Sequence, residues 1–493
     1  MNNDNPNRAS HARRRPEQTR NGSPARTSPS ARSAGSSGPS GSSGRQYSAG
    51  VSRAGTRAAP KKTNAAAGTP EKTRALAPAA KASSPKAAAK REQRLTRQRE
   101  NARAEARWQE DIVRVRGGID GAMLAIILIL VALGSITVFS ASYPEAVRKT
   151  GDGMTYIRSQ ILYVLIGLGF MTGMIFFPIR WYRKWAPQTA YGIAVLLLIA
   201  VQFIGTSEGV TMRWIDVGPF NVQPSEIMKL AIILMIAWYF DKYEDRMNDP
   251  RYGFREQYKW NTIFPIAILG GACLLVLAGK HLSGTIIVGM IGLLMLIVGG
   301  CNLKWLFATG GPLGIGAIGI FLLTNPYAWK RIATKLDENA DKLDELYQTT
   351  QSIYAIGSGG LFGVGLGESR QKFSYLTAAH TDFIFAIWCE EWGFLGAVAL
   401  IVLFLLFMWR GYVIALRAPD KFTMLTAFGI TTHVGIQAFF NMCVVADMFP
   451  NTGITLPFFS YGGSSLIVLL FEMGILLAIS KQYYRKKSDL RIK

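Results

Sequence analysis

Long apolar runs separated by short polar stretches make up the chain from about residue 120 to its end. A helix needs about 20 apolar residues to cross the hydrocarbon core of a bilayer, and ten runs approach or exceed that length. Several of them are short or are interrupted by glycine. The pattern predicts an all-α polytopic integral membrane protein, not a soluble globular one, with ten transmembrane helices at 120–141, 160–178, 188–204, 225–240, 262–279, 284–301, 305–324, 383–409, 424–447 and 464–480.

The first 118 residues follow a different pattern, rich in Ser, Ala, Pro, Gly, Arg and Lys. They carry 25 Lys and Arg against 8 Asp and Glu, a net charge of +17. Such a segment cannot bury enough apolar surface to fold, so we expect a disordered basic tail. Within it, residues 88–116 mix charges at helical spacing, which favours a juxtamembrane helix. Aromatic residues do not interleave with the charge, so nucleic acid is not an expected partner.

The Lys and Arg residues between the apolar runs predict how the chain is oriented. Basic connections stay on the cytoplasmic side of a membrane. We therefore expect residues 119–493 to span a bacterial cytoplasmic membrane with both termini on its cytoplasmic side. The connections after runs two, four, six and eight and the C-terminus carry, in order, Arg180, Arg183 and Lys184; Lys242, Arg246, Arg251, Arg255 and Lys259; Lys304; Arg410, Arg417 and Lys421; and Lys481, Arg485, Lys486, Lys487, Arg491 and Lys493.

One predicted external connection, at about 325–382, is much longer than the others. Structureless connections of that length are commonly functional. Its first half mixes charges of both signs and favours an amphipathic helix on the outer surface. Its second half, G-S-G-G-L-F-G-V-G-L-G, suits backbone that packs tightly inside protein at the membrane edge. It lacks the Lys-Ser/Thr ending and the strand-to-helix context of a phosphate-binding loop.

The segment T-M-R-W-I-D-V-G-P-F-N-V-Q-P-S-E-I-M-K carries the first group of candidate functional residues. The Pro-Ser pair predicts a helix start, which puts Glu226 and Lys229 one turn apart within the membrane. Ionisable groups at that depth are expensive and commonly functional; the alternative is an internal ion pair that only holds helices together. Arg213 is suited to contact an anionic headgroup. The candidate binding residues here are Arg213, Gln223, Glu226 and Lys229.

Three further segments lie at predicted external helix ends. Lys280 and His281 form a short turn and either hold a diphosphate as point charges or snorkel to water. Asp382 begins the eighth apolar run beside two phenylalanines, where partial desolvation would raise its pKa toward that of a general base. The alternative for Asp382 is an interaction with the helix dipole. His380 is a second titrating candidate, and Ser464, in L-P-F-F-S-Y-G-G-S-S, either donates to a ligand or packs.

A set of strings in this part of the chain resembles the shape, elongation, division and sporulation (SEDS) family, the FtsW/RodA/SpoVE group. They are V-F-S-A-S, R-W-I followed by Q-P-S-E-I-M-K, the stretch Q-S-I-Y-A-I-G-S-G-G-L-F-G-V-G-L-G-E-S-R-Q-K, H-T-D-F-I-F-A, E-E-W-G-F-L-G and L-P-F-F-S-Y-G-G-S-S. They occur in family order from about Asp120 to the end, and the basic tail lies outside them. The string G-E-S-R-Q-K-F-S-Y-L is more similar to the division and sporulation members than to the elongation ones.

The resemblance implies a peptidoglycan glycosyltransferase that polymerises lipid II on the outer membrane face during cell division or shape maintenance. Asp382 corresponds to the family's essential aspartate and would act as general base, while Arg213, Lys229 and Lys280 would stabilise the leaving diphosphate. The implied partners are a class B penicillin-binding transpeptidase and other division or elongation proteins. A divalent cation, Mg²⁺ or Mn²⁺, is compatible with the family, although the sequence itself predicts no metal site.

Two departures from the family pattern lie near these residues. The turn between runs five and six reads K-H-L-S-G-T, without the family's acid, and L-T-A-A-H places Thr377 and Ala378 where the family has Pro and Glu. Both put an acid or metal role at those positions in doubt and leave Asp382 in place. Two other functions stay open. A lipid II flippase would use the same polar residues with alternating access, and a non-catalytic division scaffold would need only binding surfaces.

Overall fold

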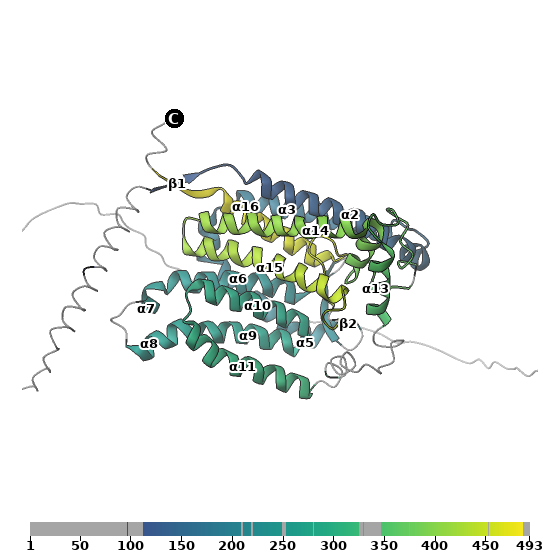
Figure 1. The fold of residues 1–493 in the computed structure, drawn as a ribbon. Helices are drawn as coiled ribbons and strands as arrows, with labels where there is room; N and C mark the ends of the chain where they lie inside the picture. The colour runs from purple at the N-terminus through teal and green to yellow at the C-terminus, as the bar shows by residue number, and fades with distance from the viewer. Residues whose placement is uncertain are drawn as a thin grey trace, which may run out of the picture. The chain divides into compact units, whose positions relative to one another are not determined.

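The computed structural model describes residues 96, 112–208, 211–217, 220–248, 253–279, 281–324, 329, 347–373, 375–451 and 453–486. The predicted disordered tail therefore lies almost wholly outside the described residues, as does the charged first half of the long connection. Ten helices of the described part run back and forth between two ends of a bundle (Figure 1). They are α2 (Gly121–Thr150), α3 (Thr155–Phe176), α5 (Ala186–Ile204), α6 (Pro224–Lys242), α9 (Phe264–Ala278), α10 (Leu282–Gly299), α11 (Leu303–Thr324), α14 (Ile384–Arg417), α15 (Lys421–Val445) and α16 (Gly463–Ser480).

These ten helices coincide with the ten predicted apolar runs, which confirms the fold class. Nine of the ten correspond, within the described part of the chain, to helices long and apolar enough to cross a membrane; α9 reaches that length only together with the preceding α8 and η1, as Phe254–Ala278. The tenth is α6, which carries Glu226, Lys229, Asp241 and Lys242. The count of ten spans stays a prediction for that reason. The chain is a multi-pass membrane protein.

The short elements divide between the two ends of the bundle. At one end lie α4 (Ile179–Lys184), α7 (Glu244–Asn248), α8 (Phe254–Tyr258) and the π-helical turn η1 (Lys259–Ile263). We call this the basic end, because those of the predicted cytoplasmic Lys and Arg residues that the structure describes lie there. At the other end lie α13 (Tyr347–Ser358) and the strands β2 (Thr206–Glu208), β3 (Thr211–Val217) and β4 (Phe220–Val222). We call this the site end.

Helix ends follow local chemistry at both ends of the bundle. Asp120 caps α2 by accepting a 2.9 Å hydrogen bond from the amide of Met123, and Asp420 caps α15 in the same way from Thr423. Side-chain oxygens at this position satisfy amides that have no partner inside the helix. α6 begins at Pro224, whose fixed φ and missing N–H suit the first helical turn. The predicted helix start at Pro224 and Ser225 is thereby confirmed.

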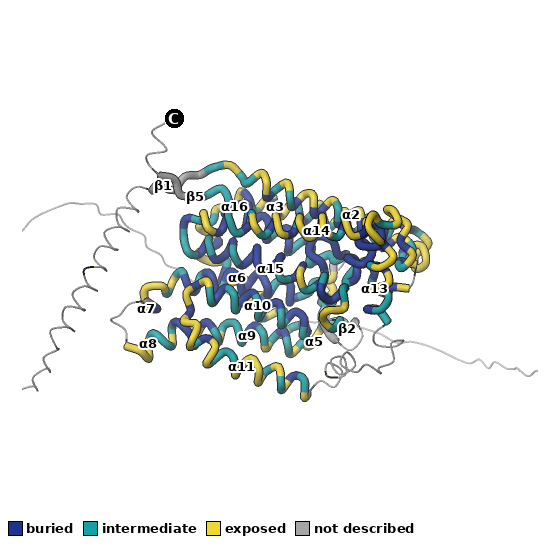
Figure 2. The backbone as a smooth tube through the Cα atoms, in the orientation of Figure 1, coloured by how far each residue is buried: buried dark blue, intermediate teal, exposed yellow. Residues whose placement is uncertain are grey.

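Burial separates central helices from peripheral ones. Side chains of α6, α15 and α16 are mostly buried, whereas α5 and α11 expose large apolar residues such as Phe203 and Leu323 (Figure 2). Exposed apolar surface of this extent suits contact with lipid, where no water has to be excluded. The polar residues described below are carried mainly by the central helices.

Two small antiparallel sheets complete the described structure. β2, β3 and β4 pair at the site end, while β1 (Ile112–Arg116) pairs with β5 (Gln482–Lys486). The prediction of a helix over 88–116 is wrong for its last five residues. Their sequence, I-V-R-V-R, alternates β-branched and basic residues, which favours a strand with an available partner. The rest of that stretch, apart from Thr96, lies outside the described residues.

The Gly-rich segment packs against a break in α14. Gly393 has φ 67° and ψ −165°, which interrupts the helix. The amides of Val364 and Gly365 donate to the carbonyls of Glu390 and Glu391, and the amide of Phe394 donates to the carbonyl of Gly360. The backbone groups freed by the break are thus paired with the loop, as burial requires. The backbone of this segment packs against α14 as expected, but Leu361, Phe362 and Leu366 are exposed, so the expectation that the segment lies inside the protein is wrong for these side chains.

Candidate active site

The backbone of Asp382 is fixed by hydrogen bonds to two other segments. Three successive carbonyls each accept a donor: His380 from the amide of Tyr461 at 2.9 Å, Thr381 from the hydroxyl of Ser460 at 2.6 Å, and Asp382 from Nδ2 of Asn441 at 2.7 Å. Ser460 and Tyr461 belong to the L-P-F-F-S-Y string, and Asn441 is fully buried on α15. The two strings that carry Asp382 and Ser464 are therefore neighbours in space, although about 80 residues separate them.

Asp382 lies just outside the eighth long helix. α14 begins at Ile384 and its N-cap is Phe383, so Asp382 precedes the cap and does not begin the helix. The side chains of Phe383 and Phe385 are buried, and Asp382 itself is half-buried. The expected apolar surroundings are present, and a half-buried carboxylate remains accessible to a substrate hydroxyl. Ala378, one of the two departures from the family pattern, starts this turn with φ 59°.

Aromatic rings enclose His380, the second titrating candidate. Its ring centroid lies 4.9 Å from that of Tyr156 and 5.6 Å from that of Tyr461. Nδ1 of His380 lies 3.2 Å from Oε2 of Glu145, without aligned hydrogen-bond geometry. Burial raises the pKa of the Tyr461 hydroxyl to about 12, so it stays protonated at neutral pH. His380 is therefore held between a carboxylate and two phenols.

Lys229 is the centre of a buried polar network between three helices. Its Nζ lies 2.7 Å from Oε1 of Glu226 and donates a 2.6 Å hydrogen bond to Oε1 of Gln437. The same Gln437 oxygen lies 3.0 Å from Nε2 of His433, whose Nδ1 lies 2.8 Å from Oε2 of Glu472. All five side chains are buried. The internal ion pair considered as an alternative for Glu226 and Lys229 is the arrangement observed.

One face of α15 joins the Lys229 network to the Asp382 segment. Gln437 donates from Nε2 to the backbone and hydroxyl of Thr455, both at 3.1 Å, while Asn441 donates to the carbonyl of Ile454 at 2.7 Å. Residues four apart on a helix are neighbours with Cβ atoms about 5–6 Å apart. Gln437 and Asn441 therefore hold adjacent parts of one loop, and each also reaches one of the two candidate groups.

A second buried charge cluster supports the segment leading to Asp382. Lys372 Nζ lies 3.1 Å from Oε1 of Glu391 and donates to the hydroxyl of Ser140 at 3.0 Å. Glu390 accepts from the hydroxyl of Ser369 and from the amide of Arg370. Three of the quoted strings, V-F-S-A-S, G-E-S-R-Q-K and E-E-W-G, thus meet at one place. Glu390 and Glu391 are thus paired within the protein, an arrangement typical of structural residues.

The structure describes the side chains of some of the other predicted binding residues and not of others. Ser464 accepts from the backbone amide of Gln223 at 3.3 Å, which joins the starts of α6 and α16. His281 Nδ1 lies 3.1 Å from the hydroxyl of Ser225, so the short turn between α9 and α10 also contacts the start of α6. Lys280 lies outside the described residues. Arg213 is in β3, but its side chain also lies outside what the structure describes.

The described residues do not provide a set of ligands for a divalent cation. Mg²⁺ and Mn²⁺ bind carboxylate and carbonyl oxygens in sets of several ligands. No group of three or more His, Cys, Asp or Glu residues with such an arrangement occurs in the part of the chain that the structure describes. These residues do not fit a dedicated metal site, and we derive no step through a metal ion.

Comparisons with known proteins place this geometry in a family. The family model described as "Cell cycle protein", FtsW/RodA/SpoVE, matches residues 121–485. The chain belongs to the FtsW/RodA/SpoVE family. It is 37% identical over 365 residues to the "Probable peptidoglycan glycosyltransferase FtsW" of Geobacter sp. (strain M18), covering 74% of this chain and 97% of that one. It is also 37% identical to "Stage V sporulation protein E" of Bacillus subtilis (strain 168), covering 73% and 96%.

Solved structures similar to this chain agree with the fold. A chain in "Structural coordination of polymerization and crosslinking by a peptidoglycan synthase complex" is similar at 26% identity and a TM-score of 0.60, with 73% of this chain and 97% of that chain covered. The rod shape determining protein RodA of Thermus thermophilus is similar at 27% identity and a TM-score of 0.54, with 73% and 96% covered. The resemblance predicted from the quoted strings is confirmed.

Several residues of the candidate site were not among the sequence candidates. Gln437, His433 and Glu472 are polar side chains within apolar runs, and intramembrane polar groups are functional candidates by default. That signal was present and would have identified them. Asn441 carries the same signal. Glu145 did not carry this signal, because it lies where the first helix extends beyond its apolar run.

Proposed function

We propose that this chain is a peptidoglycan glycosyltransferase that joins lipid II disaccharide units into glycan strands, with Asp382 as its general base. The observation that carries the proposal is the fixed backbone of Asp382, whose carbonyl and the two before it are each hydrogen-bonded. A carboxylate on an immobilised segment can be held close to the acceptor hydroxyl, which is what efficient proton transfer needs. Relatives named as peptidoglycan glycosyltransferases support the same reaction.

The proposed reaction breaks one bond and forms another at the anomeric carbon. The 4-hydroxyl of the acceptor sugar gives its proton to Asp382 while its oxygen attacks C1 of the donor. The bond from C1 to the diphosphate oxygen breaks, and undecaprenyl diphosphate leaves with the electron pair. Developing negative charge on that group favours nearby cations. Arg213 and Lys280 are the candidates for direct contact, since the ammonium group of Lys229 already contacts Glu226 and Gln437.

The site end is proposed to face outward from the bacterial cytoplasmic membrane. Those of the predicted cytoplasmic Lys and Arg residues that the structure describes lie at the opposite end of the bundle, and basic connections remain on the cytoplasmic side. An external site would meet lipid II after its headgroup has crossed the membrane. A class B penicillin-binding transpeptidase is the proposed partner, supported by the similarity to a chain of a synthase complex for polymerisation and crosslinking.

Polymerisation in detergent tests this function against the two alternatives. Purified chain, mixed with lipid II and its transpeptidase partner, should produce glycan strands that a muramidase degrades. Micelles have no second compartment, so a flippase would form no glycan strands there. A non-catalytic scaffold would form no strands in any condition. Vesicles that show lipid II movement without strand formation under the same conditions would overturn the proposal.

A further inference from the structure

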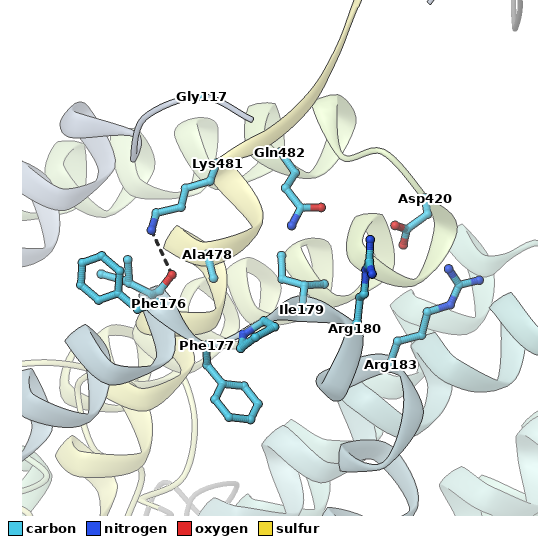
Figure 3. A pocket seen from close by; sticks show the side chains of 12 residues that line it. Gly117, Phe176, Phe177, Ile179, Arg180, Arg183, Asp420, Ala478, Lys481 and Gln482 are labelled. Atoms are coloured by element: carbon cyan, nitrogen blue, oxygen red, sulfur yellow. Dashed lines mark hydrogen bonds between the residues drawn. The ribbon is translucent and has the colours of Figure 1, made fainter. Parts of the chain in front are cut away.

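A cavity of about 650 Å³ lies at the basic end of the bundle, far along the helices from Asp382. The end of α3, the short helix α4 and the end of α16 form its walls, and Asp420 lies at its edge (Figure 3). Phe176, Phe177 and Ile179 provide apolar surface. None of these residues belongs to the site described above.

Three cationic side chains line the same cavity. Arg180 is exposed, and its guanidinium makes no ion pair with another residue in the described part of the chain. Arg183 lies 2.7 Å from Asp241 and is half exposed. Lys481 donates a 3.1 Å hydrogen bond to the carbonyl of Ile175 and keeps two further N–H groups. Asp420, whose carboxylate accepts from the amide of Thr423, is the one acid among the residues that line the cavity, so the three cations outnumber it.

The aromatic residues around α4 are typical of the membrane–water boundary. Trp181 and Trp185 are 59% and 56% exposed, and Phe176 is 73% exposed. Tryptophan at the end of a membrane helix commonly lies at headgroup level, with its ring against the acyl chains. Lys481 Nζ lies 4.5 Å from the centroid of the Phe176 ring, so cationic and apolar side chains adjoin in this cavity, as they do at the depth of lipid phosphates.

We propose that this cavity binds an anionic phospholipid, with its headgroup in the cavity that Arg180 and Lys481 line from opposite sides and an acyl chain along Phe177 (Figure 3). Basic pockets between helices on the cytoplasmic side suit such headgroups. A free phosphate would leave the apolar wall unused. The proposal is independent of the glycosyltransferase function.

Native mass spectrometry of the full chain in detergent, with added phosphatidylglycerol, tests this site. Each lysine or arginine near an anionic lipid is worth about 5-fold in binding, so Arg180→Gln with Lys481→Gln should weaken it about 25-fold. Arg180→Gln alone, at an exposed position that does not endanger folding, should weaken it about 5-fold. Binding of zwitterionic phosphatidylcholine should be weaker in the wild type and unchanged by these substitutions.

A matched variant separates a specific site from general charge attraction. Lys304→Gln with Lys421→Gln removes the same charge at the same end but outside the cavity, and should leave phosphatidylglycerol binding within about 2-fold at physiological salt. An equal loss in this control would overturn the proposal. Displacement of the lipid by millimolar inorganic phosphate would also overturn it, because the cavity would then be a phosphate site.

Discussion

The two ends of the bundle stabilise charged groups in opposite ways. At the site end, Lys229, Glu226, Lys372 and Glu391 are buried and meet in networks that cross several helices. At the basic end, pairs such as Lys421 with Glu244, 3.0 Å apart, lie near water, with side chains 20% and 48% exposed. Buried pairs are strongly coupled and depend on accurate geometry, whereas exposed pairs are screened and contribute little.

The two ends therefore suit different tasks: the site end positions one carboxylate precisely, and the basic end attracts anionic groups in general. The site end uses long irregular connections, held by glycine contacts and by carbonyl-to-donor hydrogen bonds, to fix one carboxylate. The basic end uses short turns and exposed cations, which suit anionic lipid headgroups without a fixed partner for each charge. We therefore expect substitutions at the site end to have the larger effects.

The largest effect is expected where the Gly-rich segment meets the break in α14. Gly363 has φ 83°, and a Cβ there would lie 2.1 Å from the carbonyl oxygen of Glu391. Gly363→Ala should lower the free energy of unfolding by about 4 kcal/mol or more. Gly360→Ala is the matched control, because Gly360 also has positive φ but open space around it; about 1 kcal/mol is expected. Thermal midpoints in detergent measure both, and equal losses would refute the packing argument.

Breaking the Lys229 network should be the next most damaging change. Lys229→Met leaves Glu226 buried without its cation, which should cost about 3 kcal/mol of stability. Adding Glu226→Gln should restore much of that loss, since the uncompensated charge is removed. Lys421→Met at the basic end is the control and should cost no more than about 1 kcal/mol. If the double variant is no more stable than Lys229→Met, the ion pair is not what these residues contribute.

A smaller effect is expected from Asn441, which holds the carbonyl of Asp382. Asn441→Ala should reduce the polymerisation rate about 10-fold, because small displacements of a catalytic group reduce rates strongly. The Michaelis constant for lipid II should change little. Asn451→Ala is the control, because it removes a 2.8 Å hydrogen bond from the loop after α15 to Gln348 of α13. This variant should stay near the wild-type rate. A change confined to the Michaelis constant would assign Asn441 to binding instead.

The smallest effect belongs to Asp120 at the basic end. Burial raises its pKa, but hydrogen bonds from Arg410 and from the amide of Met123 outweigh this and hold the pKa below its ordinary value of 3.8. A lowered folded pKa stabilises the fold above the ordinary value and loses that stability as the pH falls through the folded value. Asp120→Asn should therefore lose about 1 kcal/mol at neutral pH. The thermal midpoints of variant and wild type should converge as the pH falls below 3.8; a constant difference would contradict the linkage.

Apolar patterning predicted the helices well because each span has to satisfy its own backbone hydrogen bonds in lipid. It also predicted the adjacency of Glu226 and Lys229, which depends on a short spacing. It placed the Gly-rich segment inside the protein, where the structure instead leaves the large apolar side chains of that segment exposed. The strand at Ile112–Arg116 was missed because its partner, Gln482–Lys486, is at the other end of the chain. The contacts of Asp382 with Ser460 and Asn441 were not predictable for the same reason: the sequence does not show which distant loops meet.

The central claim is that the Asp382 carboxylate accepts a proton during glycosyl transfer. The direct test compares Asp382→Asn with the wild type for the initial rate of lipid II polymerisation at saturating substrate, alongside lipid II binding. Asparagine keeps the shape and the backbone hydrogen bonds but cannot act as a base. We predict a rate lower by about 10²–10⁴-fold with lipid II affinity nearly unchanged. A variant that polymerises at the wild-type rate would contradict the account.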